Sequence, residues 1–168
     1  LNFLSAIAAN MSDSIVVTDA RFAIAYINKK TEEMFGYSID EIRGQTPGIF
    51  NADPAADEIQ RELYATVSQG KDYLGESINR RKDGSTFFCE YKVTPLIGED
   101  GAPYAYIGLQ QDITERKRME TQLIKARHEL EMKVKERTRE LEEANTALRV
   151  YLQQQSSDQK RVEEKLQL

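Results

Sequence analysis

The sequence predicts an α+β domain followed by one long helix. From residue 14 onward, two strand patterns are followed by several short helix patterns, and three longer strand patterns complete the domain. This order, unlike regular alternation of strands and helices, is typical of an antiparallel sheet with helices on one face. Residues 113–168 contain no Gly, Pro or Phe and are rich in Glu, Lys, Arg, Gln and Leu. That composition indicates a long helix, so we expect the globular part to end near Asp112.

The chain is expected to open with a helix and a β-hairpin. Apolar residues recur at helical spacing near the start, so residues 2–10 are predicted to form a short amphipathic helix. A β-branched strand over residues 14–18 follows, and residues 22–28 form its hairpin partner.

Short helices are predicted between the first two strands and the last three. A helix over residues 31–35 is expected to end at Gly36, which favours the left-handed conformation of a helix end. Ser38 and Glu41 have the spacing of a capping box for a second short helix, which Gly44 ends.

A third helix is expected after an irregular stretch at residues 46–51. Asp53 is predicted to be its N-cap and Pro54 its first residue, the pairing that helix starts prefer. Its apolar residues are spaced four apart, and Gly70 is expected to end it.

The last three strands are predicted over residues 73–79, 87–95 and 104–110. The first two are joined by a charged hairpin tip that contains the step Asp83-Gly84, a strong turn signal. In the second strand apolar and charged residues alternate, as a half-buried antiparallel strand requires.

Composition narrows the classes of function. The net charge is −5 with acidic and basic residues interleaved, so nothing marks a nucleic-acid-binding stripe. The single cysteine excludes a disulfide framework within the chain and an all-cysteine metal site. No apolar run approaches membrane-spanning length, and no signal peptide is evident, so we expect a cytoplasmic protein, although a membrane-anchored parent stays open. The chain begins without Met, which indicates a piece of a longer protein.

Three blocks of the sequence resemble one family. They are Gly36-Tyr37-Ser38 with Glu41 and Gly44, then Asn79-Arg80-Arg81-Lys82-Asp83-Gly84, and finally Asp112-Ile113-Thr114-Glu115-Arg116-Lys117. In this order and spacing they resemble a PAS domain followed by its signalling helix, over roughly residues 5–118. The resemblance implies a five-stranded antiparallel sheet of order 2-1-5-4-3 whose helices enclose a ligand pocket. We therefore divide the chain into an N-terminal helix (1–12), a PAS sensor domain (13–113) and a coiled-coil signalling helix (114–168).

The resemblance also bears on the cofactor, which stays unknown. Haem-sensing members generally hold iron through a histidine inside the domain, and the only histidine here, His128, lies beyond it, which disfavours histidine-ligated haem. Light-sensing LOV members carry a reactive cysteine where this chain has Pro47, so cysteinyl-adduct photochemistry is excluded there. Asn79 and Gln110 match flavin-contacting positions, whereas Cys89 replaces a second asparagine. Flavin is thus one alternative, and amides that only satisfy backbone groups at strand ends are the other.

A pocket is predicted between the sheet and the helices of residues 29–69. Strand alternation places a mixture of apolar, amide and hydroxyl side chains on one concave face, with aromatic and aliphatic residues opposite, as in small-ligand sites. The predicted ligand-binding residues are Phe35, Ile49, Phe50, Ser77, Asn79, Phe87, Cys89, Tyr91, Tyr106 and Gln110, with Gly108 on the same strand face. Cys89 is read as a small core residue rather than as a redox switch.

The long helix is predicted to form a two-stranded parallel coiled coil. Leu123 and Leu130 are seven residues apart, and a second seven-residue grid begins at Val134 and includes Leu141 and Leu148. We interpret the step of four from Leu130 to Val134 as a stutter, at which the coiled coil could change register. The segment beginning at His128 lacks the sequence that follows a kinase phosphoacceptor histidine, so a surface histidine is expected.

Signal transmission is assigned to the junction before this helix. Asp112 or Thr114 is expected to cap the helix, and Asp112 is expected to reach a basic group such as Arg116. No catalytic set of carboxylates, nucleophile with histidine, or metal ligands is evident, so no enzyme activity is expected.

The predicted function is a sensory and dimerisation module of a bacterial signal-transduction protein. It would form a homodimer through the coiled coil and act on an output domain, which by resemblance is a histidine kinase, a cyclic-di-nucleotide enzyme or a helix-turn-helix regulator. The alternatives are a purely structural dimerisation module without ligand and a flavin-binding redox sensor.

Overall fold

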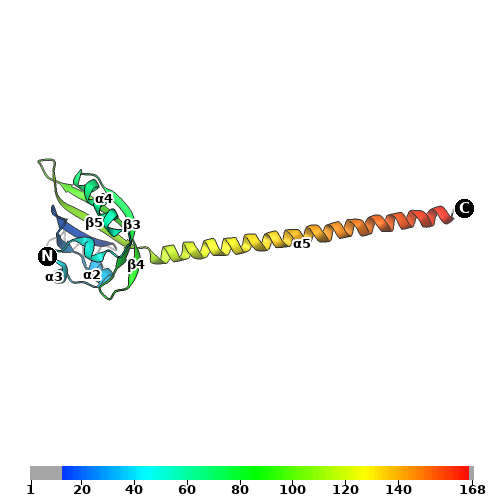
Figure 1. The fold of residues 1–168 in the computed structure, drawn as a ribbon, viewed down its shortest axis with the longest axis horizontal. Helices are drawn as coiled ribbons and strands as arrows, with labels where there is room; N and C mark the ends of the chain where they lie inside the picture. The colour runs from blue at the N-terminus through cyan, green and yellow to red at the C-terminus, as the bar shows by residue number, and fades with distance from the viewer. Residues whose placement is uncertain (1–12, 167–168) are drawn as a thin grey trace. The chain divides into compact units, whose positions relative to one another are not determined.

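A computed structural model describes the backbone of residues 13–166 and the side chains of residues 13–160. The helix expected over residues 2–10 lies outside the described residues. The elements, in chain order, are β1 (Ser14–Asp19), β2 (Ile24–Ile27), α2 (Lys29–Phe35), α3 (Ile39–Ile42), the 3-10 turn η1 (Pro47–Phe50), α4 (Ala56–Ser68), β3 (Tyr73–Arg80), β4 (Thr86–Ile97), β5 (Pro103–Asp112) and α5 (Thr114–Leu166) (Figure 1).

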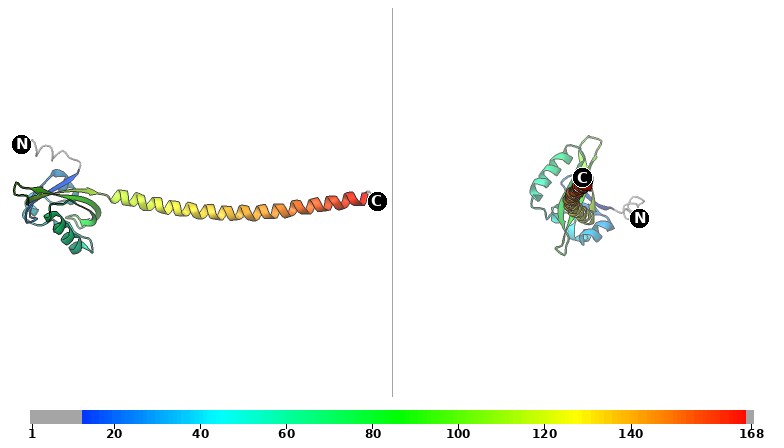
Figure 2. Two further views of the ribbon diagram at one scale, coloured as in Figure 1. Left: turned by 90° about the horizontal axis from the view of Figure 1, so that it is seen from above. Right: turned by 90° about the vertical axis from the view of Figure 1, so that its right-hand side faces the viewer.

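The five strands form one antiparallel sheet of order β2-β1-β5-β4-β3. The first and last strands in the sequence are thereby neighbours in the middle of the sheet, and α4 lies over one of its faces (Figure 2). The predicted fold class, strand order and placement of the helices are confirmed.

Two helix ends follow the sequence prediction closely. Gly36 follows α2 with φ +78°, the left-handed conformation expected of it. The capping box of Ser38 and Glu41 is present at α3, and Gly44 after that helix has φ +80°. Helix α2 contacts β1, and α3 contacts β2.

The prediction that Asp53 is the N-cap of α4 and Pro54 its first residue is wrong. The helix begins at Ala56, and its N-cap position is occupied by Ala55. One carboxylate oxygen of Asp53 accepts a hydrogen bond from the Ala55 amide at 2.9 Å, and the other accepts one from the Ile78 amide of β3 at 3.1 Å. A carboxylate has two acceptor oxygens, and here one of them ties the loop to the sheet instead of capping the helix.

The hydrophobic core lies between the sheet and α2, α3 and η1. The rings of Phe35 and Phe50 are stacked with centroids 4.1 Å apart, and the Phe87 ring lies 5.4 Å from that of Phe35. All three side chains are buried, as are Ile24 and Ile42. Burying large aromatic rings in this way is the main source of stability for a domain of this size.

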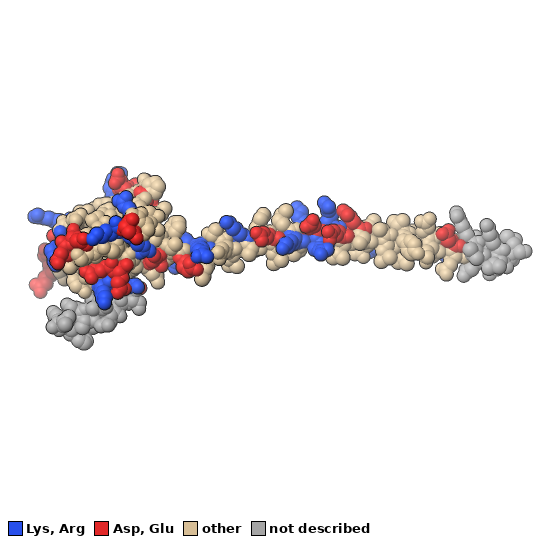
Figure 3. Space-filling model, turned by 90° about the horizontal axis from the view of Figure 1, so that it is seen from below, with Lys and Arg blue, Asp and Glu red and all other residues tan. Residues whose placement is uncertain are grey.

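Helix α5 runs for 53 residues. The chain divides into two compact units between Arg118 and Met119, so the first turn of α5 belongs to the PAS-like unit. Acidic and basic side chains are interspersed along the middle of the helix (Figure 3). None of the helices in the described part of the chain is both long and apolar enough to cross a membrane.

Candidate functional site

A cavity of about 80 Å³ lies between the sheet and the segment formed by η1 and α4. Its walls are mostly aromatic and aliphatic, with a few amide and hydroxyl groups, which is the composition of small-ligand sites. Of the residues predicted to bind ligand, those that line it are Phe50, Ser77, Asn79, Tyr91, Tyr106 and Gln110, and Gly108 lines it as well. Whether they contact a ligand stays a prediction.

Four predicted residues, Phe35, Ile49, Phe87 and Cys89, do not line this cavity. Phe35, Phe87 and Cys89 are buried in the hydrophobic core, and Ile49 packs against it. Strand alternation correctly indicates which face of the sheet a residue occupies. It does not indicate which helix covers that part of the face, and α2 fills the space over Phe87.

Sequence reasoning missed several residues that line the cavity, among them Thr18, Phe22, Gln60 and Tyr64. The period of two in β1, which carries the buried residues Ser14, Val16 and Thr18, could have indicated Thr18. Gln60 and Tyr64 are one helical turn apart, and the Gln60 amide donates to the Tyr64 hydroxyl at 3.0 Å. Nothing in the pattern indicated that Phe22, a residue of the β1–β2 turn, reaches the cavity.

A buried hydroxyl in the cavity wall, that of Thr18, has no hydrogen-bond partner among the described residues. Thr18 is 5% exposed, and within the described residues its Oγ1 atom is buried with no hydrogen-bond partner. By contrast, Asn51 donates to the Gln60 side chain at 3.3 Å and Ser77 donates to Asn79 at 3.0 Å. A buried hydroxyl left unsatisfied costs free energy, so a polar group that came within hydrogen-bond distance of Thr18 Oγ1 would remove that cost.

Burial raises the pKa values of phenol and thiol groups in and near the cavity. It raises the pKa of Tyr91 to about 12, and it also raises the pKa of Tyr64 despite the hydrogen bond from Gln60. Both phenols are therefore neutral at physiological pH and able to donate hydrogen bonds. Burial likewise raises the pKa of the Cys89 thiol to about 12, which leaves almost no reactive thiolate.

The cavity does not fit a flavin as it stands. Pockets for ligands of drug size measure roughly 300–1,000 Å³, whereas this cavity measures about 80 Å³. The Phe22 ring occupies part of the space between the sheet and α4. We therefore assign no flavin chemistry to the residues Asn79 and Gln110 in this conformation.

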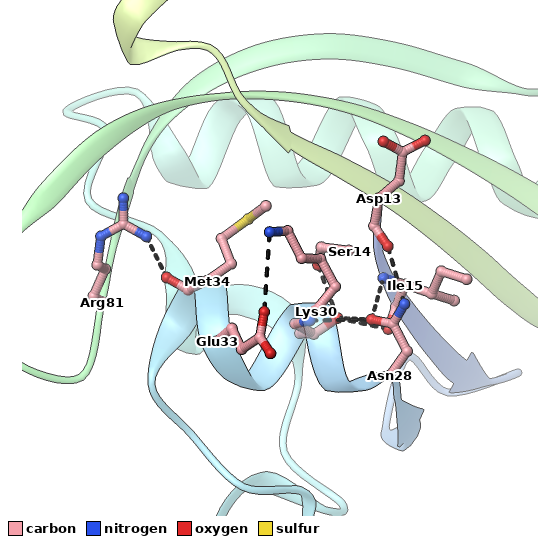
Figure 4. Close-up of polar contacts among 9 residues, drawn as sticks. Asp13, Ser14, Ile15, Asn28, Lys30, Glu33, Met34 and Arg81 are labelled. Atoms are coloured by element: carbon pink, nitrogen blue, oxygen red, sulfur yellow. Dashed lines mark hydrogen bonds and ion pairs between the residues drawn. The ribbon is translucent and has the colours of Figure 1, made fainter. Parts of the chain in front are cut away.

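A buried polar network connects the cavity to α2 through Gln110. The Ser14 hydroxyl donates to Gln110 Oε1 at 3.1 Å and lies 2.8 Å from the Thr31 hydroxyl. Asn28 Oδ1 accepts from the amides of Ile15 at 2.9 Å and Thr31 at 3.0 Å, and its amide group donates to a backbone carbonyl (Figure 4). The sequence analysis did not find this network, although Asn28 directly precedes a helix at an N-cap position.

The junction with α5 is held by Asp112. One carboxylate oxygen accepts from the Thr114 amide at 2.9 Å, and the Thr114 hydroxyl accepts from the Phe88 amide at 3.0 Å. The other oxygen pairs with Arg81 at 2.6 Å. Arg81 also donates to the Met34 carbonyl at the end of α2 (Figure 4). Its guanidinium group lies over the ring of Phe87.

The prediction that Asp112 pairs with Arg116 is wrong, because Asp112 pairs with Arg81. Arg116 instead pairs with Glu90 at 2.8 Å and with Glu76 at 3.6 Å. The strand register explains the difference, because Cys89 of β4 lies opposite Asp112 and brings the β3–β4 hairpin tip beside the end of β5. Arg116, on the first turn of α5, faces the acidic residues of β3 and β4.

The pKa of Asp112 reflects these contacts. Partial burial acts to raise it, but the hydrogen bonds from Thr114 and the pairing with Arg81 outweigh burial, so the pKa lies below its ordinary value. The carboxylate is charged at physiological pH and can hold both partners together.

Comparison with known proteins supports the assignment that the fold suggests. The chain is 31% identical over 103 residues to the nitrogen fixation regulatory protein of Klebsiella oxytoca, covering 61% of this chain and 21% of that protein. It is 29% identical over 128 residues to the blue-light-activated histidine kinase of Rhizobium johnstonii, covering 74% of this chain and 37% of that protein. The chain therefore spans only a minor part of the length of these relatives.

A solved structure and a family model both match this chain to a PAS domain. The crystal structure of the PAS domain of a protein from Colwellia psychrerythraea superimposes with a TM-score of 0.62 at 28% identity, over 67% of this chain and 95% of that one. The family model described as PAS domain matches residues 12–115. The chain belongs to the PAS domain family of sensor modules.

Proposed function

We propose that this chain is the sensory and dimerisation module of a signal-transduction protein, in which the state of the cavity changes the start of α5. Membership of the PAS family and the relatives named as a regulatory protein and a histidine kinase support a sensory role. We propose that an output domain following α5 receives the signal and that it is a histidine kinase or a regulatory domain, as the names of these relatives suggest.

The observation that carries the proposal is the position of Gln110. Its side chain lines the cavity and bonds to Ser14, and it also borders a cleft of about 370 Å³ whose walls include Arg81 and Asp112. Two residues further on, Asp112 holds the first amide of α5 and the guanidinium of Arg81. A ligand that changed the hydrogen bonds of Gln110 would therefore act next to the residues that fix the helix start.

The apolar residues of α5 support a parallel homodimer. Leu123, Leu130, Val134, Leu141 and Leu148 are all more than half exposed within the described part of the chain. Their spacing follows the predicted seven-residue grids, and a second copy of α5 is the partner that such a narrow seam fits. A signal at the start of the helix would then reach the output domain as a change in how two helices pack.

Hydrogen exchange at residues 112–118 tests the coupling. We expect Gln110→Ala to change the exchange rates of these amides, because it removes the contact between the cavity and Ser14. Gln69→Ala is the matched control, since Gln69 is exposed and lines neither the cavity nor the cleft. Equal exchange in Gln110→Ala and the unmodified chain would contradict the proposed route.

A structural dimerisation module without ligand is the second candidate. The small volume of the cavity and the Phe22 ring that fills part of it favour this alternative. Native mass spectrometry of the chain purified from cells separates the two functions. A small molecule retained at a stoichiometry of one per chain supports the sensor, and a chain that carries none and fails to gain thermal stability from any compound of a metabolite library supports the structural module.

A further inference from the structure

The turn between β1 and β2 contains a strained aromatic residue. Phe22 has φ +62°, and no other described residue except glycine has a positive φ. The turn is closed by hydrogen bonds from the Phe22 amide to the Asp19 carbonyl at 3.0 Å and from the Asp19 amide to the Ala23 carbonyl at 2.9 Å. At this left-handed position of a three-residue hairpin loop, glycine is the residue that avoids strain, and a bulky side chain costs about 1–2 kcal/mol.

The ring of Phe22 lies in a slot between two tyrosines. It stacks on Tyr64 of α4 with centroids 3.7 Å apart and planes 6° apart. It also stacks on Tyr106 of β5 with centroids 4.4 Å apart and planes 9° apart. Because two parallel rings cannot occupy the same side, Phe22 is sandwiched between them, and the slot has the width of one flat ring.

The slot borders the cavity, whose lining includes Thr18. Phe22, Tyr64, Tyr106 and Thr18 all line the same cavity. Thr18 lies opposite Tyr106 in the pairing of β1 with β5. The phenyl ring of Phe22 has no polar atom that could bond to Thr18 Oγ1, whereas a heteroaromatic ring with a polar edge does.

We propose that Phe22 is a displaceable plug and that the slot between Tyr64 and Tyr106 binds a planar aromatic ligand of one or two rings that carries a hydrogen-bonding edge. The ligand replaces the stacking of Phe22 on both tyrosines and satisfies Thr18. Withdrawal of Phe22 also allows the turn to leave its strained conformation, which lowers the cost of opening the slot. This inference deepens the proposed sensory function, because it names the class of ligand that the cavity would take.

Indole is a suitable probe for the test. It is a flat two-ring molecule with one N–H group, and the chain contains no Trp, so the fluorescence of indole can be excited without a tryptophan background. We expect Phe22→Gly, which removes the plug, to bind indole about tenfold more tightly than the unmodified chain, because the competing ring no longer occupies the slot. In the same background, Tyr64→Leu should abolish that gain.

Tyr104→Ala is the matched control, because it removes an exposed aromatic side chain of β5 that does not line the cavity. This variant should bind indole as the unmodified chain does. Equal affinities of Phe22→Gly and the unmodified chain, or a gain that survives Tyr64→Leu, would overturn the proposal. Circular dichroism establishes that each variant is folded.

A second measurement uses the unmodified chain and does not depend on whether Phe22→Gly folds. Titration with indole should shift the backbone amide NMR signals of Phe22 and Ala23, since the turn must move when the ring leaves the slot. Unchanged signals up to the solubility limit of indole would refute the plug. This readout concerns binding alone, whereas exchange at residues 112–118 in the Gln110→Ala variant concerns transmission, so the two failures are distinguishable.

Discussion

At the scale of single residues, Cys89 illustrates how burial determines chemistry. The thiol is fully buried, and burial raises its pKa to about 12 against about 8.5 for a free cysteine. We expect the native chain to react negligibly with iodoacetamide at pH 8 and the urea-unfolded chain to react fully, as mass spectrometry would measure. Rapid labelling of the folded chain would contradict the assignment of Cys89 to the core.

The same pKa shift predicts how Cys89 affects stability. Because the pKa of Cys89 is higher in the folded chain than in the unfolded chain, the protonated thiol contributes fully to the free energy of unfolding below about pH 8.5. That contribution is progressively lost as the pH rises toward 12, since the unfolded chain ionises first. Cys89→Ala should therefore lose less stability than the unmodified chain between pH 8 and pH 10. Urea unfolding at each pH gives the comparison.

The Asn28 side chain makes several hydrogen bonds that the sequence analysis did not predict. Its side chain caps α2 and joins that helix to β1, and the residue is 2% exposed. Asn28→Ala leaves several buried groups unpaired, so we expect it to lower the free energy of unfolding by about 2–4 kcal/mol. Lys29→Ala, the exposed neighbour, should change it by less than about 0.5 kcal/mol. Similar urea midpoints for the two variants would contradict the network.

At the scale of elements, the sequence predicts most of the fold because the signals are local. Gly36, the capping box of Ser38 with Glu41, and the Asp83-Gly84 turn each determine a boundary through their own chemistry. Asp53 is different, because its second oxygen bonds to β3, an element 25 residues away. Tertiary contacts of this kind are not encoded in any short stretch.

The candidate site is less predictable than the fold for the same reason. Alternation placed Ser77, Tyr91 and Gln110 on the cavity face, but it could not distinguish them from Phe87, which α2 covers. The pairing of Asp112 with Arg81 depends on strand register, which the sequence left open. The stutter also stays a prediction, and a step of four is in addition the ordinary spacing from the d position of one heptad to the a position of the next.

The junction between β5 and α5 should respond to acid. The pKa of Asp112 is lowered in the folded chain, so its stabilising contribution is present above about pH 4 and is lost as pH falls through the folded-state value. Stability should therefore decline less between pH 5 and pH 3 in Asp112→Asn than in the unmodified chain. Glu99→Gln in the exposed β4–β5 turn is the control. A decline identical to that of the unmodified chain would show that Asp112 gains nothing from Arg81 and Thr114.

At the scale of the whole molecule, the coiled coil is the property that the proposed function most needs. A chain that ends at Arg118 keeps the compact unit and the first turn of α5 but loses the exposed apolar residues from Leu123 onward. Light scattering should give a dimer mass for the full chain and a lower average mass for this shortened chain. If both chains have the mass of a monomer, α5 does not form the proposed coiled coil.

A substitution in the seam tests the same claim without shortening the chain. Leu141 is 63% exposed in the single chain, so burying both copies in a dimer would contribute about 3 kcal/mol. Leu141→Asp should therefore weaken dimerisation by at least about a hundredfold, measured by sedimentation equilibrium. Thr146→Asp adds the same charge five residues further on, outside the seven-residue grid, and should leave the dimer intact. If both variants dissociate equally, charge and not the seam governs assembly. If neither dissociates, the helices do not meet along Leu141.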